Sequence, residues 1–598
     1  MKKRIYAAGI ILFSALATAQ EKDIEEVNLF GKFLQTPMKE ANLNVTLIQK
    51  KEIENSSSRS IDELLQQVTG LDIRRRGSNG VQSDVSIRGG NFEQVLILVN
   101  GIRMNDSQTG HNSMNIPVDL SNVEKIEIIK GASARRFGNN AYGGVINIIT
   151  KTSAEENVQI SAEGGDFSTY RLGLASTSGT DKFTHNFSAN SGSSEGYRHN
   201  TDYKIRNIFY QNALKIKNGK VGFQAGFSDK KFGANGFYAS PLATEQYEET
   251  QASVVALSHQ QKFGNINLNS AVSWRRGQDM YVFNRQKPEI YRNMHIGNNV
   301  GAEINADYNS TLGTTGLGTE LRKEFLVSNN LGERERFVTQ IFFEHHFSLF
   351  NNKLELTPGI TWANYSNSGN FFFPGIDAGF KINEANRVYA NLAKVSRIPT
   401  FTDLYYVSKT EEGNPDLKPE TALSYEIGYK YNRNQTSFKA SYFGRNTDNA
   451  IDWTKSDVAA KWKAENIGSM TANGFETEIS QYLLRNIFRI DLGYTFIDNK
   501  FNKVQNFSRY TLDNLKHQVT AKLATHFGNI EHEIAYRYNE RANFGSFNIL
   551  DTKLSYRHDH LKFYTLINNL TNTRYTETFG VPMPGRWFHV GFTYNIQY

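Results

Sequence analysis

The sequence predicts a mainly β protein: a large antiparallel transmembrane β-barrel of about 22 strands, with an N-terminal α+β domain that sits as a plug inside the lumen. Three observations lead to this fold class. Aromatic residues make up 12% of the 598 residues while the mean hydropathy is polar, which excludes a bundle of membrane helices and fits many amphipathic strands. From about residue 155 onward, apolar and polar residues alternate in one hairpin after another. Before that point, the run Val95-Leu96-Ile97-Leu98-Val99 is apolar throughout, which is typical of a strand covered on both faces.

Residues 1–19 are expected to be a signal peptide. Lys2-Lys3-Arg4 precede an apolar run from Ile5 to Leu16, and Ala17-Thr18-Ala19 forms a small-x-small cleavage site. The apolar run is shorter than the roughly 20 residues of a membrane-spanning helix, so cleavage before Gln20 and export are expected. The chain contains no cysteine, which excludes a disulfide scaffold, a thiolate metal site and a lipoprotein anchor. The net charge of +7 is modest and does not indicate a nucleic-acid-binding surface.

Residues 20–45 are predicted to form a flexible arm, because they are charged, contain Pro37 and lack any clear periodicity. Within the arm, an acidic pair is followed by strand-prone apolar residues, in the order Glu25, Glu26, Val27, Asn28, Leu29 and Phe30. This segment is either a frayed terminus or an exposed strand that pairs with the sheet edge of a partner. The residues alone leave both interpretations open.

Residues 46–151 are predicted to form the small α+β domain. In SIDELLQQVTG, Ser60 and Glu63 predict a capping box at the start of a helix, and Gly70 suits the position after its end. Further on, Asn100-Gly101 is a strong hairpin signal that follows the apolar run at 95–99. This hairpin poses a question, since a strand that is apolar at every position must be covered on both sides.

Residues 155–598 are predicted to form the barrel. In TALSYEIGYKY, apolar and aromatic residues alternate with Ser424, Glu426 and Lys430, and the last segment alternates in the same way up to Tyr598. No second apolar layer is available to cover these faces, which excludes a stack of soluble sandwiches. Hydrocarbon can cover them, and because backbone groups in hydrocarbon must all be paired, the sheet must close. A lumen of this size would hold the α+β domain and cover its apolar hairpin on both sides.

Along nearly its whole mature length, the chain resembles the TonB-dependent outer-membrane receptors. The resemblance rests on the order and spacing of several segments, namely SIDELLQQVTGLDI, VSIRGG, VLILVNGIRMND, VEKIEIIKGASARRFG, AYGGVINIITK, RIPTFTDLYY with GNPDLKPE, NGFETEIS and the C-terminal NNLTNTRYTETFGVPMPGRWFHVGFTYNIQY. It implies a receptor in the bacterial outer membrane that imports a small-molecule cargo and is not an enzyme. It also implies that residues 25–30 are the TonB box, gripped by TonB and its inner-membrane energising complex. Tyr598 matches the signal read by the barrel-assembly machinery.

The same resemblance implies which residues touch the cargo. The loops at the plug apex map onto Arg76, Ser78, Asn79, Gln82, Asn105, Asp106, Gln108, His111 and Asn112. The loop at 232–240 adds Phe237 and Tyr238 as candidate contacts. No cofactor is implied, and no metal site is expected because the loop from Asp229 to Gln251 holds a single aspartate.

Charged residues in the lumen are expected to hold the plug to the wall, as the resemblance implies for Arg88 with Glu476 and Glu478. Pairing is expected because an isolated buried charge is costly. The run Arg74-Arg75-Arg76 could face either an anionic ligand or the acidic wall of the lumen. The surroundings implied for the barrel are outer-membrane lipid and lipopolysaccharide, the chain is expected to be a monomer, and no nucleic-acid partner is expected.

The arm, the compact barrel and the C-terminal segment are most similar to those of cobalamin receptors. A ferric siderophore is the alternative cargo, because the same scaffold serves both. Haem is disfavoured, since no histidine lies between the motifs at 397–399 and 414–417. A passive porin or an adhesin would not need the arm or the plug, and no serine–histidine or paired-carboxylate arrangement indicates an outer-membrane enzyme.

Overall fold

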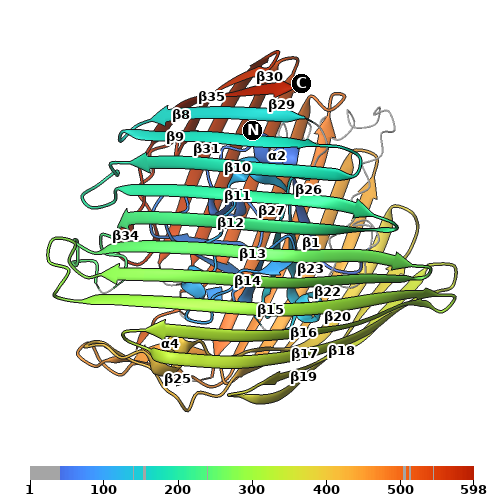
Figure 1. The fold of residues 1–598 in the computed structure, drawn as a ribbon, viewed down its shortest axis with the longest axis horizontal. Helices are drawn as coiled ribbons and strands as arrows, with labels where there is room; N and C mark the ends of the chain where they lie inside the picture. The colour runs from blue at the N-terminus through green and yellow to red at the C-terminus, as the bar shows by residue number, and fades with distance from the viewer. Residues whose placement is uncertain are drawn as a thin grey trace, which may run out of the picture.

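Among the described residues, 22 strands close into one antiparallel barrel, which confirms the predicted fold class (Figure 1). This computed structural model describes residues 41–138, 140–152, 156–238, 240–502, 507–510, 513–542 and 544–597. The predicted signal peptide, the TonB box and Tyr598 lie outside these residues. No helix in the described ranges is long and apolar enough to cross a membrane.

The barrel strands follow one another around the wall in chain order, and the last strand pairs with the first. They are β8 (Asn157–Gly165), β9 (Thr169–Gly179), β10 (Phe183–Ser194), β11 (Tyr203–Ile216), β12 (Gly219–Gly233), β13 (Tyr247–Phe263), β14 (Ile266–Val282), β15 (Arg292–Ser310), β16 (Gly313–Ser328), β17 (Gly332–Leu349), β18 (Leu354–Tyr365), β19 (Gly369–Lys381), β20 (Asn386–Arg397), β22 (Glu420–Arg433), β23 (Thr436–Asp448), β26 (Met470–Leu483), β27 (Phe488–Phe501), β29 (Leu515–Phe527), β30 (Ile530–Arg541), β31 (Gly545–His558), β32 (Leu561–Asn568) and β35 (Trp587–Gln597).

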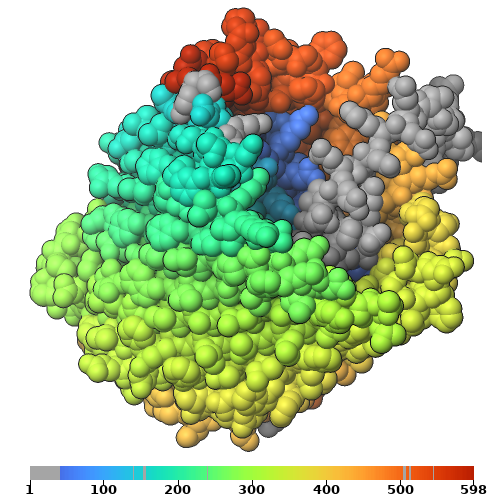
Figure 2. All heavy atoms as spheres, turned by 45° about the vertical axis from the view of Figure 1, so that its right-hand side comes forward, coloured from blue at the N-terminus to red at the C-terminus, as the bar shows by residue number. Residues whose placement is uncertain are grey.

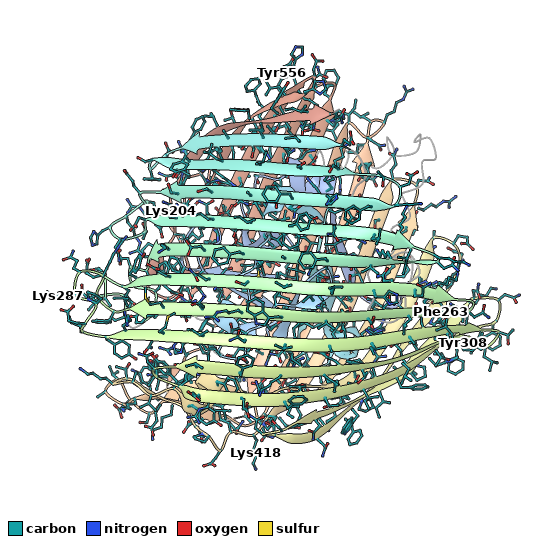
Figure 3. All side chains as sticks on the ribbon, in the orientation of Figure 1. Lys204, Phe263, Lys287, Tyr308, Lys418 and Tyr556 are labelled. Atoms are coloured by element: carbon teal, nitrogen blue, oxygen red, sulfur yellow. The ribbon has the colours of Figure 1, made fainter. Side chains whose placement is uncertain are left out.

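Strand β22 shows why the wall belongs in a bilayer. Its apolar residues point outward, with Leu423 46% and Ile427 60% exposed, while Ser424 and Glu426 between them are buried in the lumen. The exposed aromatic residues Phe263 and Tyr308 lie at the short-turn end of the wall (Figure 3). Aromatic residues at the ends of an outward apolar band are the usual girdle of a transmembrane barrel.

The wall is uneven in height. Strand β15 has 19 residues, whereas β8 has 9 and β32 has 8. About 9–11 tilted residues are enough to cross the hydrocarbon, so β15 extends well beyond it. The longer loops, including those that carry α4, β25 and β34, lie on the left in Figure 1, opposite the short turns. The loop elements are α4 (Phe401–Tyr405), β21 (Glu411–Glu412), β24 (Ile451–Lys455), β25 (Trp462–Asn466), β28 (Phe507–Ser508), β33 (Thr576–Thr578) and β34 (Val581–Pro582).

The N-terminal domain lies inside the barrel, and some of its blue atoms are visible between the barrel strands in Figure 2. We call this domain the plug. Its strands and helices are β1 (Val45–Gln49), α2 (Lys50–Asn55), α3 (Ile61–Leu65), β2 (Leu71–Arg75), β3 (Ser83–Ile87), β4 (Val95–Val99), β5 (Ile102–Arg103), β6 (Val123–Lys130) and β7 (Gly144–Thr150). Short 3-10 helices are η1 (Phe92–Gln94), η2 (Gly110–Asn112), η3 (Leu120–Asn122) and η4 (Gly131–Phe137).

The apolar hairpin of the plug is covered on both faces, as its sequence requires. Strand β4 lies between β7 and β5 in a five-stranded sheet of order β1-β6-β7-β4-β5. One face, with Ile97, joins a core that reaches Phe209 on the barrel wall, and the other, with Leu96, joins a second cluster around Phe137. Asn100 and Gly101 both have positive φ, which fits the tight turn predicted for them.

The predicted capping box at Ser60 is wrong. Ser60 is the N-cap of α3, but its side chain makes no capping hydrogen bond. The Glu63 carboxylate instead accepts from the backbone N–H of Arg59 at 2.9 Å and binds Arg75 at 3.2 Å. A charge-assisted hydrogen bond to Arg75 is stronger than the neutral bond that a capping box would supply, so the tertiary contact overrides the local motif.

Candidate functional site

The plug apex is built around a carboxylate held between two basic groups. Asp84 is the second residue of β3, the returning strand of the β2–β3 hairpin. Its oxygens lie 2.7 Å from Arg76 Nη1 and 2.6 Å from His111 Nδ1. Gln82 donates to Asp84 at 3.0 Å and accepts from Arg76 at 2.8 Å. Burial alone would raise the pKa of the Asp84 carboxyl, but Arg76 and His111 lower it below its usual range. Asp84 is therefore an ionised anchor that orients both basic side chains.

A barrel loop closes over this anchor. His111 stacks on Phe92 with ring centroids 4.1 Å apart, and its Nε2 lies 3.3 Å from the hydroxyl of Tyr510. Tyr510 comes from the loop between β27 and β29, and burial raises its pKa to about 12, so the hydroxyl stays protonated. His111 nevertheless keeps 20% of its side chain exposed. Phe92 and Tyr510 thus cover most of the His111 side chain.

A row of tyrosines runs from the apex towards the rim. Arg76 lies over the ring of Tyr238 at 5.5 Å, and Tyr238 meets Tyr281 edge to face at 5.6 Å. Tyr281 leads to Tyr291 at 6.5 Å, whose hydroxyl lies 3.2 Å from that of Tyr406. Aromatic faces with polar edges suit a large ligand that is flat and carries polar groups at its rim.

Two further predicted residues, Gln108 and Asn112, also belong to the apex. Their amide groups donate to the carboxylate of Asp279 on β14, at 3.2 and 3.5 Å. Together with Arg76, Gln82 and Tyr238, they form one polar cluster at the long-loop end of the plug, in which Gln108 and Asn112 are buried. The structure therefore brings together six of the predicted contacts: Arg76, Gln82, Gln108, His111, Asn112 and Tyr238.

Asn105 and Asp106 have a supporting place instead. The Asn105 side chain accepts from Ile97 N and donates to Val95 O, both at 2.9 Å, which ties the loop to β4. Asp106 binds Arg275 on the wall at 2.9 Å. Both side chains make their contacts within the protein, and these contacts position the apex loop.

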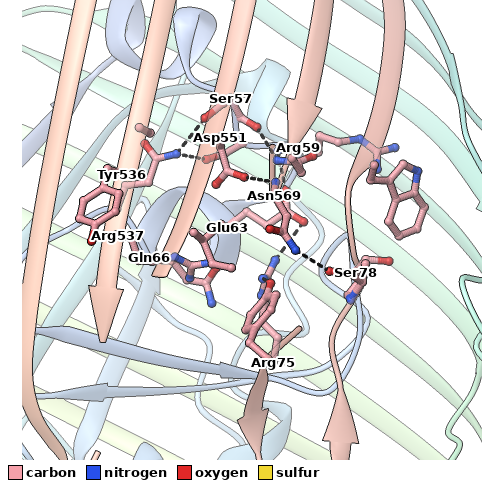
Figure 4. Close-up of a pocket in the computed structure, with 18 of the residues that line it drawn as sticks. Ser57, Arg59, Glu63, Gln66, Arg75, Ser78, Tyr536, Arg537, Asp551 and Asn569 are labelled. Atoms are coloured by element: carbon pink, nitrogen blue, oxygen red, sulfur yellow. Dashed lines mark hydrogen bonds and ion pairs between the residues drawn. The ribbon is translucent and has the colours of Figure 1, made fainter. Parts of the chain in front are cut away.

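The remaining three predicted residues are held by other contacts of the fold. Phe237 is buried in a cluster with Val81 and Phe232. Asn79 bonds to Tyr203 on the wall, and Ser78 lines a cavity of about 50 Å³ between the plug and the strands β30 and β31 (Figure 4). That cavity is far smaller than the roughly 300–1,000 Å³ of a typical ligand pocket.

The arginine run at 74–76 is engaged by carboxylates. Arg75 binds Glu577 at 2.9 Å, and Arg74 binds Asp72 at 3.0 Å and Asp513 at 3.5 Å. Of the two interpretations left open by the sequence, the contacts place Arg74 and Arg75 against acidic groups of the fold. Their charges hold the hairpin to the wall and its loops.

Buried ion pairs hold the plug to the wall on the side of β22 and β26. Arg88 binds Glu426 at 2.9 Å and Glu476 at 3.3 Å. Glu478, expected to pair with Arg88, binds Lys130 at 3.0 Å instead. Glu426 was missed as a partner of Arg88, although its inward position in the alternating TALSYEIGYKY segment signals a lumen charge.

The apex residues that sequence reasoning missed are Asp84, Phe92, Asp279 and Tyr510. Asp84 carried a usable signal, because a charge inside the short strand SDVSI must find a buried partner. Tyr510 carried none, since its contact with His111 joins segments about 400 residues apart. Among the described residues, no group of three or more metal-ligating side chains is found.

Comparisons with known proteins cover both parts of the chain. A model of the TonB-dependent receptor plug domain matches residues 37–145, and a model of the TonB-dependent receptor-like β-barrel matches residues 149–570. The vitamin B12 transporter BtuB of Vibrio vulnificus (strain CMCP6) is 25% identical over 604 residues, which cover 94% of each chain. BtuB of Photobacterium profundum is 24% identical over 522 residues, covering 84% of this chain and 83% of its own.

Solved structures of receptors share the fold. The siderophore receptor PirA of Pseudomonas aeruginosa superimposes with a TM-score of 0.75 at 17% identity, covering 92% of this chain and 99% of its own. The FrpB iron transporter of Neisseria meningitidis gives 0.78 at 15% identity, covering 93% and 99%. At these identities the likeness concerns the fold alone. With the plug and the barrel both matched, the chain belongs to the TonB-dependent receptor family of the bacterial outer membrane.

Proposed function

We propose that the protein actively imports a corrinoid of the cobalamin type, with energy supplied through TonB. One observation carries the proposal: the similarity to vitamin B12 transporters runs through plug and barrel together and covers 94% of both chains. A ferric siderophore is the alternative cargo.

A plugged lumen makes the transport active. The plug is bound to the wall by buried ion pairs such as Arg88 with Glu426, so a large solute does not diffuse through. The outer membrane offers neither nucleotide nor ion gradient, and work must enter mechanically. In this proposal TonB grips residues 25–30 by β-addition, and cargo at the apex shifts the arm from a docked to a free state.

The apex supports a flat, largely uncharged cargo. The tyrosine row offers ring faces, and the amide groups of Gln108 and Asn112, which donate to Asp279, lie at its foot. An anionic iron chelate would call for cations without partners, yet Arg74, Arg75 and Arg76 each bind a carboxylate. For cargo to reach His111, Tyr510 must move away.

The remaining partners follow from the same proposal. Outer-membrane lipid and lipopolysaccharide would surround the apolar band, and the barrel-assembly machinery would read Tyr598. We expect a monomer, because a single closed barrel has no free sheet edge to share. No catalytic role is assigned.

Uptake of labelled cobalamin tests the proposal, in cells that lack their own receptor and express this chain. Uptake should require TonB and should be lost in Leu29→Pro, because proline removes a backbone donor from the strand that TonB pairs with. His111→Ala should weaken uptake, whereas Val458→Ala in an exposed loop should leave it unchanged. TonB-dependent uptake of a ferric siderophore but not of cobalamin would establish the alternative, and uptake that persists without TonB would indicate a passive porin.

A further inference from the structure

We propose that the solute crosses the barrel along one sector of the seam between plug and wall, beside β8–β11 and β31–β35, and that Arg59 is the gate of this passage. The inference rests on the proposed import function and adds the route that the solute takes through the barrel. It is drawn from two cavities that meet at one cluster of ion pairs.

The lower half of the passage is already open. A cavity of about 700 Å³ lies between the plug and the strands β8, β9, β10, β31, β32 and β35. It is lined by the turn at Asp559 and His560 and by Asn157 at the start of β8, which places it at the short-turn, periplasmic end. Its lining is mixed, and lysine and arginine side chains from plug and wall lie among its polar groups.

The upper half is narrower. A second cavity of about 80 Å³ lies between the plug and β9 to β12, and it reaches Asn79, Gly80 and Lys230 near the apex. The two cavities share five lining residues: Arg59, Asp119, Leu120, Arg171 and Asn190. They are therefore adjacent, and a small set of side chains separates them.

Charged groups form this partition. Arg59 lies 2.8 Å from Glu163 on β8, and Glu163 also accepts from the Tyr564 hydroxyl at 3.1 Å. Arg171 on β9 donates to the backbone carbonyl of Arg59 at 2.6 Å and pairs with Asp119 of the plug. Ion pairs of this kind can close a passage while its walls stay polar, because water can solvate each charged partner again when the two separate.

The position of Arg59 in the chain connects the gate to the arm. Strand β1 lies at the edge of the plug sheet, and among the described strands it pairs with β6 alone. The single helix α2 and residues 56–58 then lead to Arg59. A pull from the N-terminal side would strip an edge strand and one short helix before it draws Arg59 away from Glu163. The β4–β7 core would stay in place.

The opposite sector is fastened differently. On the β18–β26 side, Arg135 binds Asp377 at 2.8 Å and Arg88 binds Glu426 at 2.9 Å. Along the chain these arginines follow β3 and β6, well after β1 and α2. Asn44, just before β1, also donates to Glu426 at 3.2 Å. The pull would break that weaker contact first, while the two arginine pairs would persist as Arg59 is displaced. The pull thus opens one sector and leaves the plug tethered on the other.

Conductance of the purified full-length protein in planar lipid bilayers tests the gate, without cargo or TonB. Arg59→Ala should raise the frequency of conducting events at least about tenfold over the unaltered chain, equivalent to about 1.4 kcal/mol. Arg135→Ala is the matched control, because it removes an equally buried plug arginine at the same distance from a wall carboxylate. Glu163→Gln supplies a second variant that leaves the plug untouched, for use if Arg59→Ala does not insert.

Blocking single introduced cysteines with a thiol reagent locates the route. This experiment is possible because the chain contains no cysteine. In the Arg59→Ala background, a thiol reagent should reduce the current through Asn190→Cys, at the junction of the cavities. It should not affect Ser273→Cys, which lines a separate cavity beside β14. Folded Arg59→Ala and Glu163→Gln variants that do not conduct, equal conductance in Arg135→Ala, or current through Asn190→Cys that resists the reagent would each overturn the proposal. Failure of cobalamin uptake would refute the cargo without changing these currents.

Discussion

Isoleucine side chains point inward in the plug and outward in the barrel wall. In the plug, Ile97 and Ile126 are at most 1% exposed and pack against other side chains of the domain. In the wall, Ile427 is 60% exposed, while its neighbour Glu426 points into the lumen and is buried. The difference teaches that burial here depends on what lies outside: protein surrounds the plug core, and hydrocarbon surrounds the wall.

Between these two regions lies a polar seam. Both of its sides carry charges, as in the contacts of Arg88 with Glu426 and of Arg59 with Glu163. An apolar seam would resist water once formed, whereas polar surfaces on both sides can be rehydrated as they part. The seam therefore holds the plug firmly at rest and still allows a sector of it to open.

The largest effect is expected from breaking the seam at Arg88, a buried cation that binds two carboxylates of the wall. Arg88→Ala leaves Glu426 and Glu476 without their guanidinium partner, and this should lower the free energy of unfolding of the plug by about 3–5 kcal/mol. Hydrogen exchange of the β2–β3 and β4 amides measures the loss. Arg88→Lys keeps the positive charge but not the forked guanidinium group, and it should lose less stability than Arg88→Ala. Unchanged exchange in Arg88→Ala would show that the seam does not stabilise the plug.

A smaller effect tests the outward direction of the wall. Ile427→Lys places a charge in hydrocarbon near the middle of β22 and should cost about 2–4 kcal/mol of barrel stability. Denaturant unfolding in lipid vesicles measures it. Val458→Lys, at a 77% exposed loop position, should cost almost nothing. Equal stability of the two variants would mean that Ile427 does not face lipid.

The smallest effect concerns the apex. Because the folded pKa of Asp84 lies below its ordinary value of about 3.9, its stabilisation is complete above that pH and is lost as the pH falls through the folded pKa. Asp84→Asn should therefore destabilise the β2–β3 hairpin by about 1–3 kcal/mol at neutral pH. The difference from the unaltered chain should shrink in strong acid.

Hydrogen exchange at a series of pH values checks this dependence. Asp416→Asn, at an exposed loop position, is the control and should show no such pH-dependent difference. A difference for Asp84→Asn that is the same at all pH values would exclude the ion pair as its cause.

Much of the fold could be predicted because it depends on local patterns. Alternation in segments such as 422–431 indicated a wall with one apolar face, and Asn100-Gly101 marked the turn that the structure contains. The capping box at Ser60 failed for an instructive reason, since Arg75 competes for the same Glu63 carboxylate from the neighbouring strand. A local motif predicts the contact correctly unless the fold brings a stronger partner to the same side chain.

The candidate site was only partly predictable. Arg76, His111 and Tyr238 are predicted from the sequence and do meet at the apex, but Asp84, which holds two of them, is not. Phe237 was expected beside Tyr238 at a ligand and is buried in a cluster instead. Adjacent loop residues point to different surroundings, and the chain alone does not reveal which of them turns inward.

The sequence by itself determined the membrane barrel and the plug inside it, because periodicity, turn residues and composition act over short stretches and add up along the chain. The tertiary structure alone decided which charges meet, as with Glu478 and Lys130, and which loop side chain covers the apex, as with Tyr510. The physical reason is distance along the chain. An ion pair or a ring contact depends on a few tenths of a nanometre between segments hundreds of residues apart, and no local pattern encodes that separation.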